Sequence, residues 1–118
     1  MEKIPSPFEQ LIGEELSAVV FVRDYIQLEF NPPPRLNITA PIVLDLKNGH
    51  ISQNEPAFAN AIIGQIGKFV NNMVFSPGDY LKIVFADNSS ISISLKPEDS
   101  AGGESVLISG KNQLWSVL

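Results

Sequence analysis

The chain has one histidine, His50, and histidine is the side chain best suited to general acid–base catalysis near neutral pH. It directly follows Asn48-Gly49, a dipeptide typical of tight hairpin turns. We therefore expect His50 at a hairpin tip or at the first residue of a strand, with Asp45 across the hairpin from the imidazole. The pattern favours an exposed turn residue, and a general base is the alternative.

The other reactive residue types do not form a recognisable catalytic or metal-binding motif. The sequence has no cysteine, which excludes a thiolate nucleophile, a disulfide framework and a cysteine-ligated metal. Segment 97–104 lacks the ligand spacing of a calcium loop, Gly102-Gly103 is not part of a phosphate-binding loop, and no Gly-x-Ser-x-Gly elbow is present. We therefore expect no catalytic residue, no cofactor and no metal.

Small polar residues line one side of a predicted strand. Ser90, Ser92 and Ser94 alternate with isoleucines, and Asn37 and Thr39 hold the equivalent places in an earlier strand. Small side chains leave the backbone accessible, so the serine strand is a candidate for pairing with the sheet edge of a partner. The pattern favours an ordinary solvent-facing strand, and pairing with a partner is the alternative.

The C-terminal run is unusually apolar and contains Trp115 between Leu114 and Leu118. It is either the last strand of the core, which the pattern favours, or an interface with a second subunit. The candidate binding residues are therefore His50, Ser90, Ser92, Ser94 and Trp115.

The second half of the chain repeats the pattern of the first. Ile12-Gly13 recurs as Ile66-Gly67 at an offset of 54, and Asp24-Tyr25 recurs as Asp79-Tyr80 at an offset of 55. Shared β alternation explains recurring apolar positions, but it does not explain these paired dipeptides. We therefore predict an internal duplication.

A single domain is predicted over 1–118, with repeat 1 at about 6–51 and repeat 2 at about 52–118. Each repeat is expected to open with a helix. Ser6-Pro7-Phe8-Glu9 has the pattern of a capping box with proline at the first helical position, and Ser52-Gln53-Asn54-Glu55 is a comparable start. In both copies the helix is expected to end at the Ile-Gly dipeptide.

Strands follow each helix. Apolar residues alternate over 26–30 and 81–85, which predicts strands with one buried face, and 42–46 reads as a further strand. Eight to ten short strands are expected in all. The predicted fold class is α+β and β-rich, with two short helices and duplicated α-β-β-β-β units in pseudo-twofold symmetry. The helices would cover a face or close a barrel-like sheet.

The composition is that of a folded acidic protein. Hydrophobic residues make up 44% of the chain and charged residues 18%, the opposite of a disordered chain. The net charge is −5 and the eight Lys and Arg residues are scattered, whereas nucleic-acid binders need clustered positive charge. The sequence has no apolar run long enough to cross a membrane and no secretion signal. We expect a cytoplasmic protein with neither a nucleic-acid nor a membrane partner.

Several of these motifs together resemble an uncharacterised family of short bacterial proteins. The residues that carry the resemblance are Ile12-Gly13, Asp24-Tyr25-Ile26-Gln27-Leu28-Glu29-Phe30, Leu95-Lys96-Pro97-Glu98-Asp99, Gly103-Glu104 and Trp115. The resemblance covers most of the chain and implies a bacterial protein with no established activity and no catalytic residue. Some similar small proteins are grouped with immunity proteins, which neutralise a toxin by binding it.

Two hypotheses of function follow. The first is a non-catalytic protein-interaction or binding module that acts as a homodimer, since the residues specify a scaffold without a reactive constellation. The second is a small-molecule binder or cryptic enzyme with a pocket between the two halves, because pockets favour interfaces between structural units.

Overall fold

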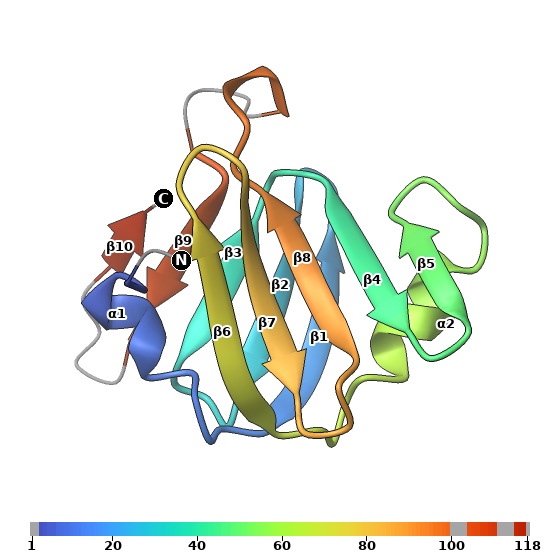
Figure 1. The fold of residues 1–118 in the computed structure, drawn as a ribbon, viewed down its shortest axis with the longest axis horizontal. Coiled ribbons are helices and arrows are strands. Elements are labelled where there is room, and N and C mark those ends of the chain that lie inside the picture. Colours follow the sequence, from blue (N-terminus) through green and yellow to red (C-terminus); the bar gives the residue numbers. More distant parts are fainter. Residues whose placement is uncertain (1–2, 100–103, 111–114, 118) are drawn as a thin grey trace.

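A computed structural model describes residues 3–99, 104–110 and 115–117. In these residues, ten strands and two short helices form two antiparallel five-stranded sheets that face each other (Figure 1). The elements are α1 (Ser6–Glu9), β1 (Leu16–Val22), β2 (Tyr25–Phe30), β3 (Arg35–Ile38), β4 (Ile42–Leu46), β5 (Gly49–Ser52), α2 (Phe58–Ile63), β6 (Val70–Ser76), β7 (Tyr80–Phe85), β8 (Ser90–Ser94), the 3₁₀ turn η1 (Pro97–Asp99), β9 (Val106–Ser109) and β10 (Trp115–Val117). The predicted β-rich α+β class is confirmed.

Each sheet combines strands from both halves of the chain. One sheet has the order β1-β2-β3-β9-β10 and the other has the order β6-β7-β8-β4-β5. The β4–β5 hairpin therefore leaves the strands that precede it and joins the second sheet through β4, which pairs with β8. β9 returns to the first sheet and pairs with β3, and β10 pairs with β9. The second sheet lies in front in Figure 1 and the first sheet lies behind it.

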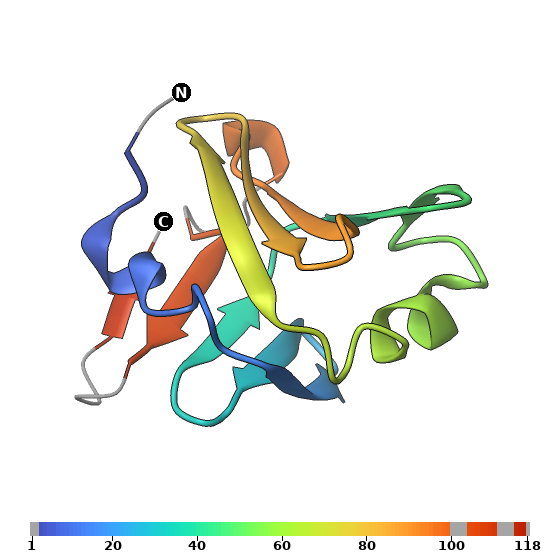
Figure 2. The ribbon, with the colours of Figure 1, turned by 60° about the horizontal axis from the view of Figure 1, so that its bottom comes forward.

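The core lies between the two sheets. The alternation predicted over 26–30 and 81–85 is confirmed, because β2 and β7 have the same buried-every-second-residue pattern. Phe30 and Phe85, at the ends of these strands, are both fully buried. The two helices lie on opposite sides of the space between the sheets (Figures 1 and 2), and each adds a buried phenylalanine, Phe8 from α1 and Phe58 from α2.

The two sheets are joined at one corner by backbone hydrogen bonds. The Gly13 N–H donates to the Val70 carbonyl at 2.8 Å, and the Gly67 N–H donates to the Leu16 carbonyl at 2.8 Å. Gly13 and Gly67 have φ angles of 89° and 97°, a left-handed conformation that glycine adopts without steric cost. Both glycines therefore make the same left-handed turn where the two sheets meet.

Both helices are shorter than predicted. Ser6 makes no capping hydrogen bond through its side chain, so the first predicted capping box does not form. The second helix begins at Phe58 and not near Ser52, because Ser52 pairs with Val43 at the end of β5. The Ser52 N–H still donates to the Glu55 carboxylate at 2.7 Å, so half of the second capping box forms in the turn before the helix. Neither helix of the described segments is long and apolar enough to span a membrane.

Candidate functional site

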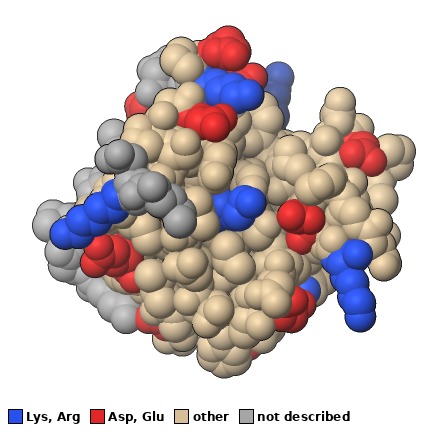
Figure 3. Space-filling model, viewed as in Figure 1, with Lys and Arg blue, Asp and Glu red and all other residues tan. Residues whose placement is uncertain are grey.

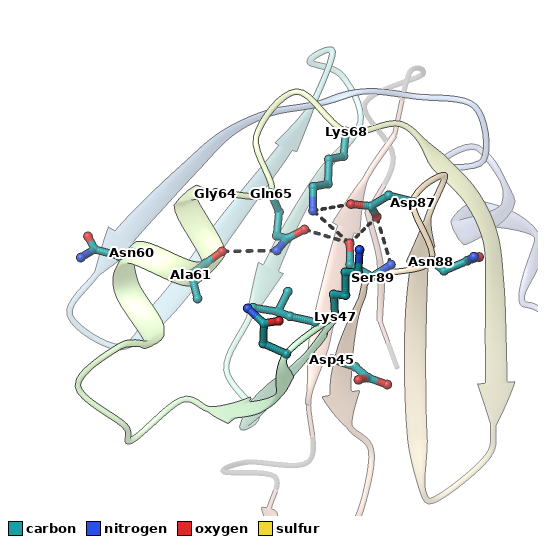
Figure 4. A pocket seen from close by; sticks show the side chains of 12 residues that line it. Asp45, Lys47, Asn60, Ala61, Gly64, Gln65, Lys68, Asp87, Asn88 and Ser89 are labelled. Carbon is teal, nitrogen blue, oxygen red and sulfur yellow. Dashed lines mark hydrogen bonds and ion pairs between the residues drawn. The ribbon is translucent and has the colours of Figure 1, made fainter.

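A polar hollow lies between α2, the β4–β5 turn and the turn that joins β7 to β8 (Figure 4). Its volume is about 680 Å³, a size that suits a small molecule. The lining includes two lysines, two aspartates and four amide side chains, so its formal charges balance. The hollow is therefore suited to hydrogen bonding with an uncharged or zwitterionic group.

Four side chains in the hollow form a network of hydrogen bonds, which we call the polar network: Gln65, Lys68, Asp87 and Ser89. Lys68 Nζ lies 2.7 Å from Asp87 Oδ2 and donates to Ser89 Oγ at 3.2 Å. In Figure 4 Lys68 and Asp87 point toward one another, whereas Asn60 points away. The network ties the segment after α2 to the β7–β8 turn.

The β7–β8 turn fixes two members of the network. Asn88 has a φ of 71°, a left-handed conformation that asparagine tolerates in turns. The Ser89 N–H donates to Asp87 Oδ1 at 3.0 Å, which closes a local turn between side chain and backbone. The turn therefore holds the Asp87 carboxylate and the Ser89 hydroxyl side by side.

Gln65 is buried in the turn that follows α2. Its N–H donates to the Ile62 carbonyl at 3.0 Å, which holds it next to the buried end of the helix. Gln65 is 2% exposed, and a buried amide needs hydrogen-bond partners. Its Nε2 donates to the Ala61 carbonyl at 3.4 Å, and its Oε1 lies 3.1 Å from Ser89 Oγ.

The Ser89 hydroxyl cannot satisfy both acceptors that surround it. Asp87 Oδ1 lies at 2.6 Å and Gln65 Oε1 at 3.1 Å, but a hydroxyl carries one proton. The carboxylate is nearer and charged, so the proton goes to Asp87. Gln65 Oε1 then competes with the carboxylate for its one donor within the described residues, and a buried acceptor that loses its donor costs about 1–3 kcal/mol.

Reversing the amide of Gln65 does not remove this conflict. With oxygen and nitrogen exchanged, Nε2 would donate to Ser89 Oγ. The oxygen would then face the Ala61 carbonyl, which lies 3.4 Å from that amide position. One acceptor lacks a donor in either orientation. The site therefore favours any group in the hollow that brings an N–H or O–H to Gln65.

The pKa of Asp87 is lowered from 3.8 to about 2, chiefly by hydrogen bonds from Lys68 and then from Ser89. Both donors stabilise the carboxylate form. Asp87 is therefore ionised at neutral pH and forms a fixed ion pair with Lys68 in the hollow.

Asp87→Asn is expected to remove a pH-dependent stabilisation. Because the folded-state pKa of about 2 lies below 3.8, Asp87 stabilises the fold above pH 3.8, and this contribution is lost as the pH falls through about 2. The side chain is 50% exposed, so solvent screening limits the contribution to about 1 kcal/mol or less. Urea unfolding from about pH 5 to about pH 2 checks this, and parallel profiles for wild type and Asp87→Asn would contradict it.

The geometry of the network does not activate Ser89 as a nucleophile. A serine beside a lysine is activated when the lysine is neutral and accepts the hydroxyl proton. Here Lys68 Nζ donates to Ser89 and contacts Asp87, and Ser89 is 6% exposed. The arrangement can hold polar groups in fixed positions, and it does not present an attacking oxygen.

His50 lies outside this hollow. It pairs with Asp45 across the β4–β5 hairpin as predicted, with His50 Nδ1 3.6 Å from Asp45 Oδ1. The two side chains are 73% and 46% exposed, and such exposed pairs contribute about 0–1 kcal/mol. The exposed position predicted for His50 is therefore confirmed, and a binding role for it stays a prediction.

The turn of this hairpin differs from the prediction. Leu46 pairs with Gly49, so the two loop residues are Lys47 and Asn48. Positive φ angles occur at Gly49 but not at Lys47 or Asn48, so the predicted type I′ turn at Asn48-Gly49 is wrong. Gly49 instead begins β5 with a φ of 129°, a conformation accessible to glycine.

Ser90, Ser92 and Ser94 lie on β8, which pairs with β4 on one side and with β7 on the other. β8 therefore has no free edge, which rules out the pairing with a partner that was the less favoured interpretation of this strand. Ser90 is 3% exposed, and the Ser94 hydroxyl donates to Asp99 at 2.6 Å. A binding role for the three side chains stays a prediction.

Trp115 begins β10 and pairs with Ser109 of β9. This places its backbone in the strand at one edge of the first sheet. Its side chain lies outside the described part of the structure, as does the Gly102-Gly103 pair. The choice between a core position and an interface stays a prediction for Trp115.

Sequence reasoning missed all four residues of the polar network. The predicted repeat contained a signal for them, because each of the four residues differs in type from its counterpart in the first half. At the same offsets of 54 and 55, the first half holds Leu11, Glu14, Pro32 and Pro34. A leucine, a glutamate and two prolines are thus exchanged for residues that hydrogen bond to one another.

Charged side chains are thinly scattered over the face drawn in Figure 3, and lysine and arginine do not cluster on it. Among residues 3–99, 104–110 and 115–117, no group of three His, Asp or Glu side chains could hold a metal ion. No family model, curated protein or solved structure matches the chain. The resemblance to an uncharacterised bacterial family stays a prediction.

Proposed function

We propose that the chain is a non-catalytic binding module that holds a small polar ligand in the hollow beside α2. The observation that carries this proposal is Gln65 Oε1, a buried acceptor whose neighbour Ser89 gives its proton to Asp87. A ligand that donates a hydrogen bond to Gln65 would relieve this cost, which supplies part of its affinity.

The contacts of the network favour a neutral polyol as the ligand. Lys68 Nζ and Gln65 Oε1 lie 3.2 and 3.1 Å from the same atom, Ser89 Oγ, so one small molecule can reach both. An ammonium has three N–H donors, and among the described residues Asp87 and Ser89 engage two of them. One ligand hydroxyl can accept from Lys68 while a neighbouring hydroxyl donates to Gln65. The balanced charges of the lining favour an uncharged molecule such as a sugar or an inositol.

Titration of isotope-labelled protein with glucose, myo-inositol and inorganic phosphate tests this proposal. We expect the two polyols, and not phosphate, to shift the amide NMR signals of Gln65, Lys68 and Ser89, with millimolar dissociation constants. Gln65→Leu should abolish these shifts and remain folded, because it removes the unsatisfied amide. Gln27→Leu, which changes the same residue type on an outer sheet face, should bind like wild type.

Two results would overturn the proposal. The first is wild-type protein that gives no concentration-dependent shifts with either polyol. The second is Gln65→Leu that binds as tightly as Gln27→Leu, because binding would then not depend on the amide.

We also propose that the chain arose by duplication of an α-β-β-β-β unit, with the two copies related by a pseudo-twofold axis. The two strand orders support this, since β1-β2-β3-β9-β10 and β6-β7-β8-β4-β5 correspond element by element. The reciprocal hydrogen bonds of Gly13 with Val70 and of Gly67 with Leu16 also support it. In this duplication the hollow lies between elements of both copies. The residues of its polar network are those in which the second copy differs from the first.

Protein interaction is the second candidate function, with a homodimer as its simplest form. Exposed apolar side chains on β1 and α2 favour it. The cytoplasmic location and the lack of a nucleic-acid partner stay predictions from composition.

A further inference from the structure

Exposed apolar side chains concentrate on two neighbouring elements, β1 and α2. Five of the eight exposed large hydrophobic residues of the described segments lie on β1, on α2 or in the turn that follows α2. We call them the β1–α2 surface: Val20, Phe21, Val22, Ile63 and Ile66. They are 37–49% exposed and α2 packs against β1, with Phe21 on the opposite face of the strand from Val20 and Val22.

The size of this surface fits the centre of a protein interface. Its five side chains expose roughly 350 Å² of apolar area, within the range of patches that are often functional on monomers. A stable interface buries about 800 Å² on each partner, and slightly more than half of that area is apolar. The β1–α2 surface supplies most of the apolar area of such an interface. A rim of polar neighbours supplies the remaining, polar area.

β1 is also an edge strand that lacks the usual protection of an edge. It stands at the end of its sheet, and residues 17–22 contain neither a charge nor a proline. Natural edge strands are commonly blunted by lysine, proline or a bulge, or covered by a helix or loop, and the turn after α2 covers β1 in this way at Leu16. The one irregularity of β1 lies at its start, between Leu16 and Ala18. The remaining edge presents an apolar template for a further strand.

The corresponding residue of the other half is covered. Phe75 on β6 lies at the repeat offset of 54 from Phe21. It is partly buried and packs against the core, whereas Phe21 is 49% exposed. Phe21 is therefore exposed because of its place on the β1–α2 surface, since the corresponding strand position in the other half is covered.

We infer that a second copy of the chain covers the β1–α2 surface, by antiparallel pairing of the two β1 strands about a twofold axis. This inference deepens the second candidate function and rests on it, and it is independent of the ligand proposed for the hollow. A twofold interface uses the same patch on both copies, so an apolar edge strand is self-complementary. Two five-stranded sheets become one continuous sheet.

The start of β1 sets the register of this pairing. The outer edge of β1 is already used at Glu15 by its bridge to Phe69 and at Leu16 by backbone hydrogen bonds with Gly67 and Lys68, which confines the new pairing to residues 18–22. Centring it on Val20 places inward-facing Phe21 of one copy opposite inward-facing Val19 of the other and keeps the faces of the two strands matched. Antiparallel pairing then brings Arg23 of each copy to the end where Glu15 of the other copy lies. Arg23 offsets the like charges of Asp24 and Glu15 that meet at the same end.

Sedimentation equilibrium over a range of concentrations tests the inference. We expect a dimer with twice the monomer mass of 12.9 kDa. Val20→Lys should raise the dimer dissociation constant at least 100-fold, because lysine blocks an edge. Val43→Lys changes a valine with almost the same exposure on the paired strand β4 and should leave the dimer intact. Circular dichroism establishes that both variants are folded.

A charge exchange tests the register. Arg23→Glu should weaken the dimer, and adding Glu15→Arg should restore it. A wild-type protein that stays monomeric at millimolar concentration would rule out the second copy as occupant. A dimer that Val20→Lys leaves unchanged would rule out β1 as the contact. Neither result affects the polyol titration, so the two proposals fail separately.

Discussion

Ser92→Pro is expected to lower the free energy of unfolding by about 3 kcal/mol or more, because proline removes a ladder hydrogen bond in a central strand. Ser92 lies opposite Val43 on β4 and opposite Lys82 on β7, so its N–H faces a paired strand in either direction. The loss is a large part of the roughly 5–15 kcal/mol that stabilise a typical domain.

Urea unfolding followed by circular dichroism measures this loss. Ser92→Ala is the matched control, since it removes the hydroxyl and keeps the N–H, and it should change the stability by less than about 0.5 kcal/mol. If Ser92→Pro were as stable as Ser92→Ala, β8 would be an edge strand, and the strand order of the second sheet would be wrong.

Phe85→Ala is expected to cost about 3–5 kcal/mol of unfolding free energy, because truncating a buried phenylalanine leaves a cavity in the core. Phe85 is 0% exposed at the end of β7 and belongs to the cluster between the sheets. Its N–H donates to the Ser89 carbonyl at 2.8 Å, so the backbone of the β7–β8 turn is held beside the cavity. A looser turn would also disturb the polar network.

Two further variants calibrate this prediction. Phe30→Ala, at the equally buried end of β2, should cost a similar amount. Phe69→Ala removes a side chain that is 53% exposed, and should cost much less than either core variant. Equal losses for Phe85→Ala and Phe69→Ala would contradict the placement of the core.

Local patterns predicted the elements of this fold well. Period-two alternation identified β2 and β7 together with their buried faces, since the rule depends only on neighbouring residues. The strand pairings were not predicted, because alternation indicates which face is buried and not which strand lies beside it.

The candidate site was harder to predict than the fold. Its four residues come from the segment after α2 and from the β7–β8 turn, and they meet only once those segments pack together. A site whose residues meet only through contacts between distant segments is hard to recognise from a short sequence motif.

The placement of the β4–β5 hairpin has a consequence for how the chain folds during synthesis. Its strands complete the sheet of β6, β7 and β8, and the sheet of β1, β2 and β3 is completed by β9 and β10. A growing polypeptide therefore leaves the ribosome with β3 paired to β2 on one edge only, until β9 has been made. Contacts this distant in sequence make folding slow. Neither half can finish its own sheet, so the nascent chain is expected to reach its stable form in one late cooperative step after nearly all of it has emerged.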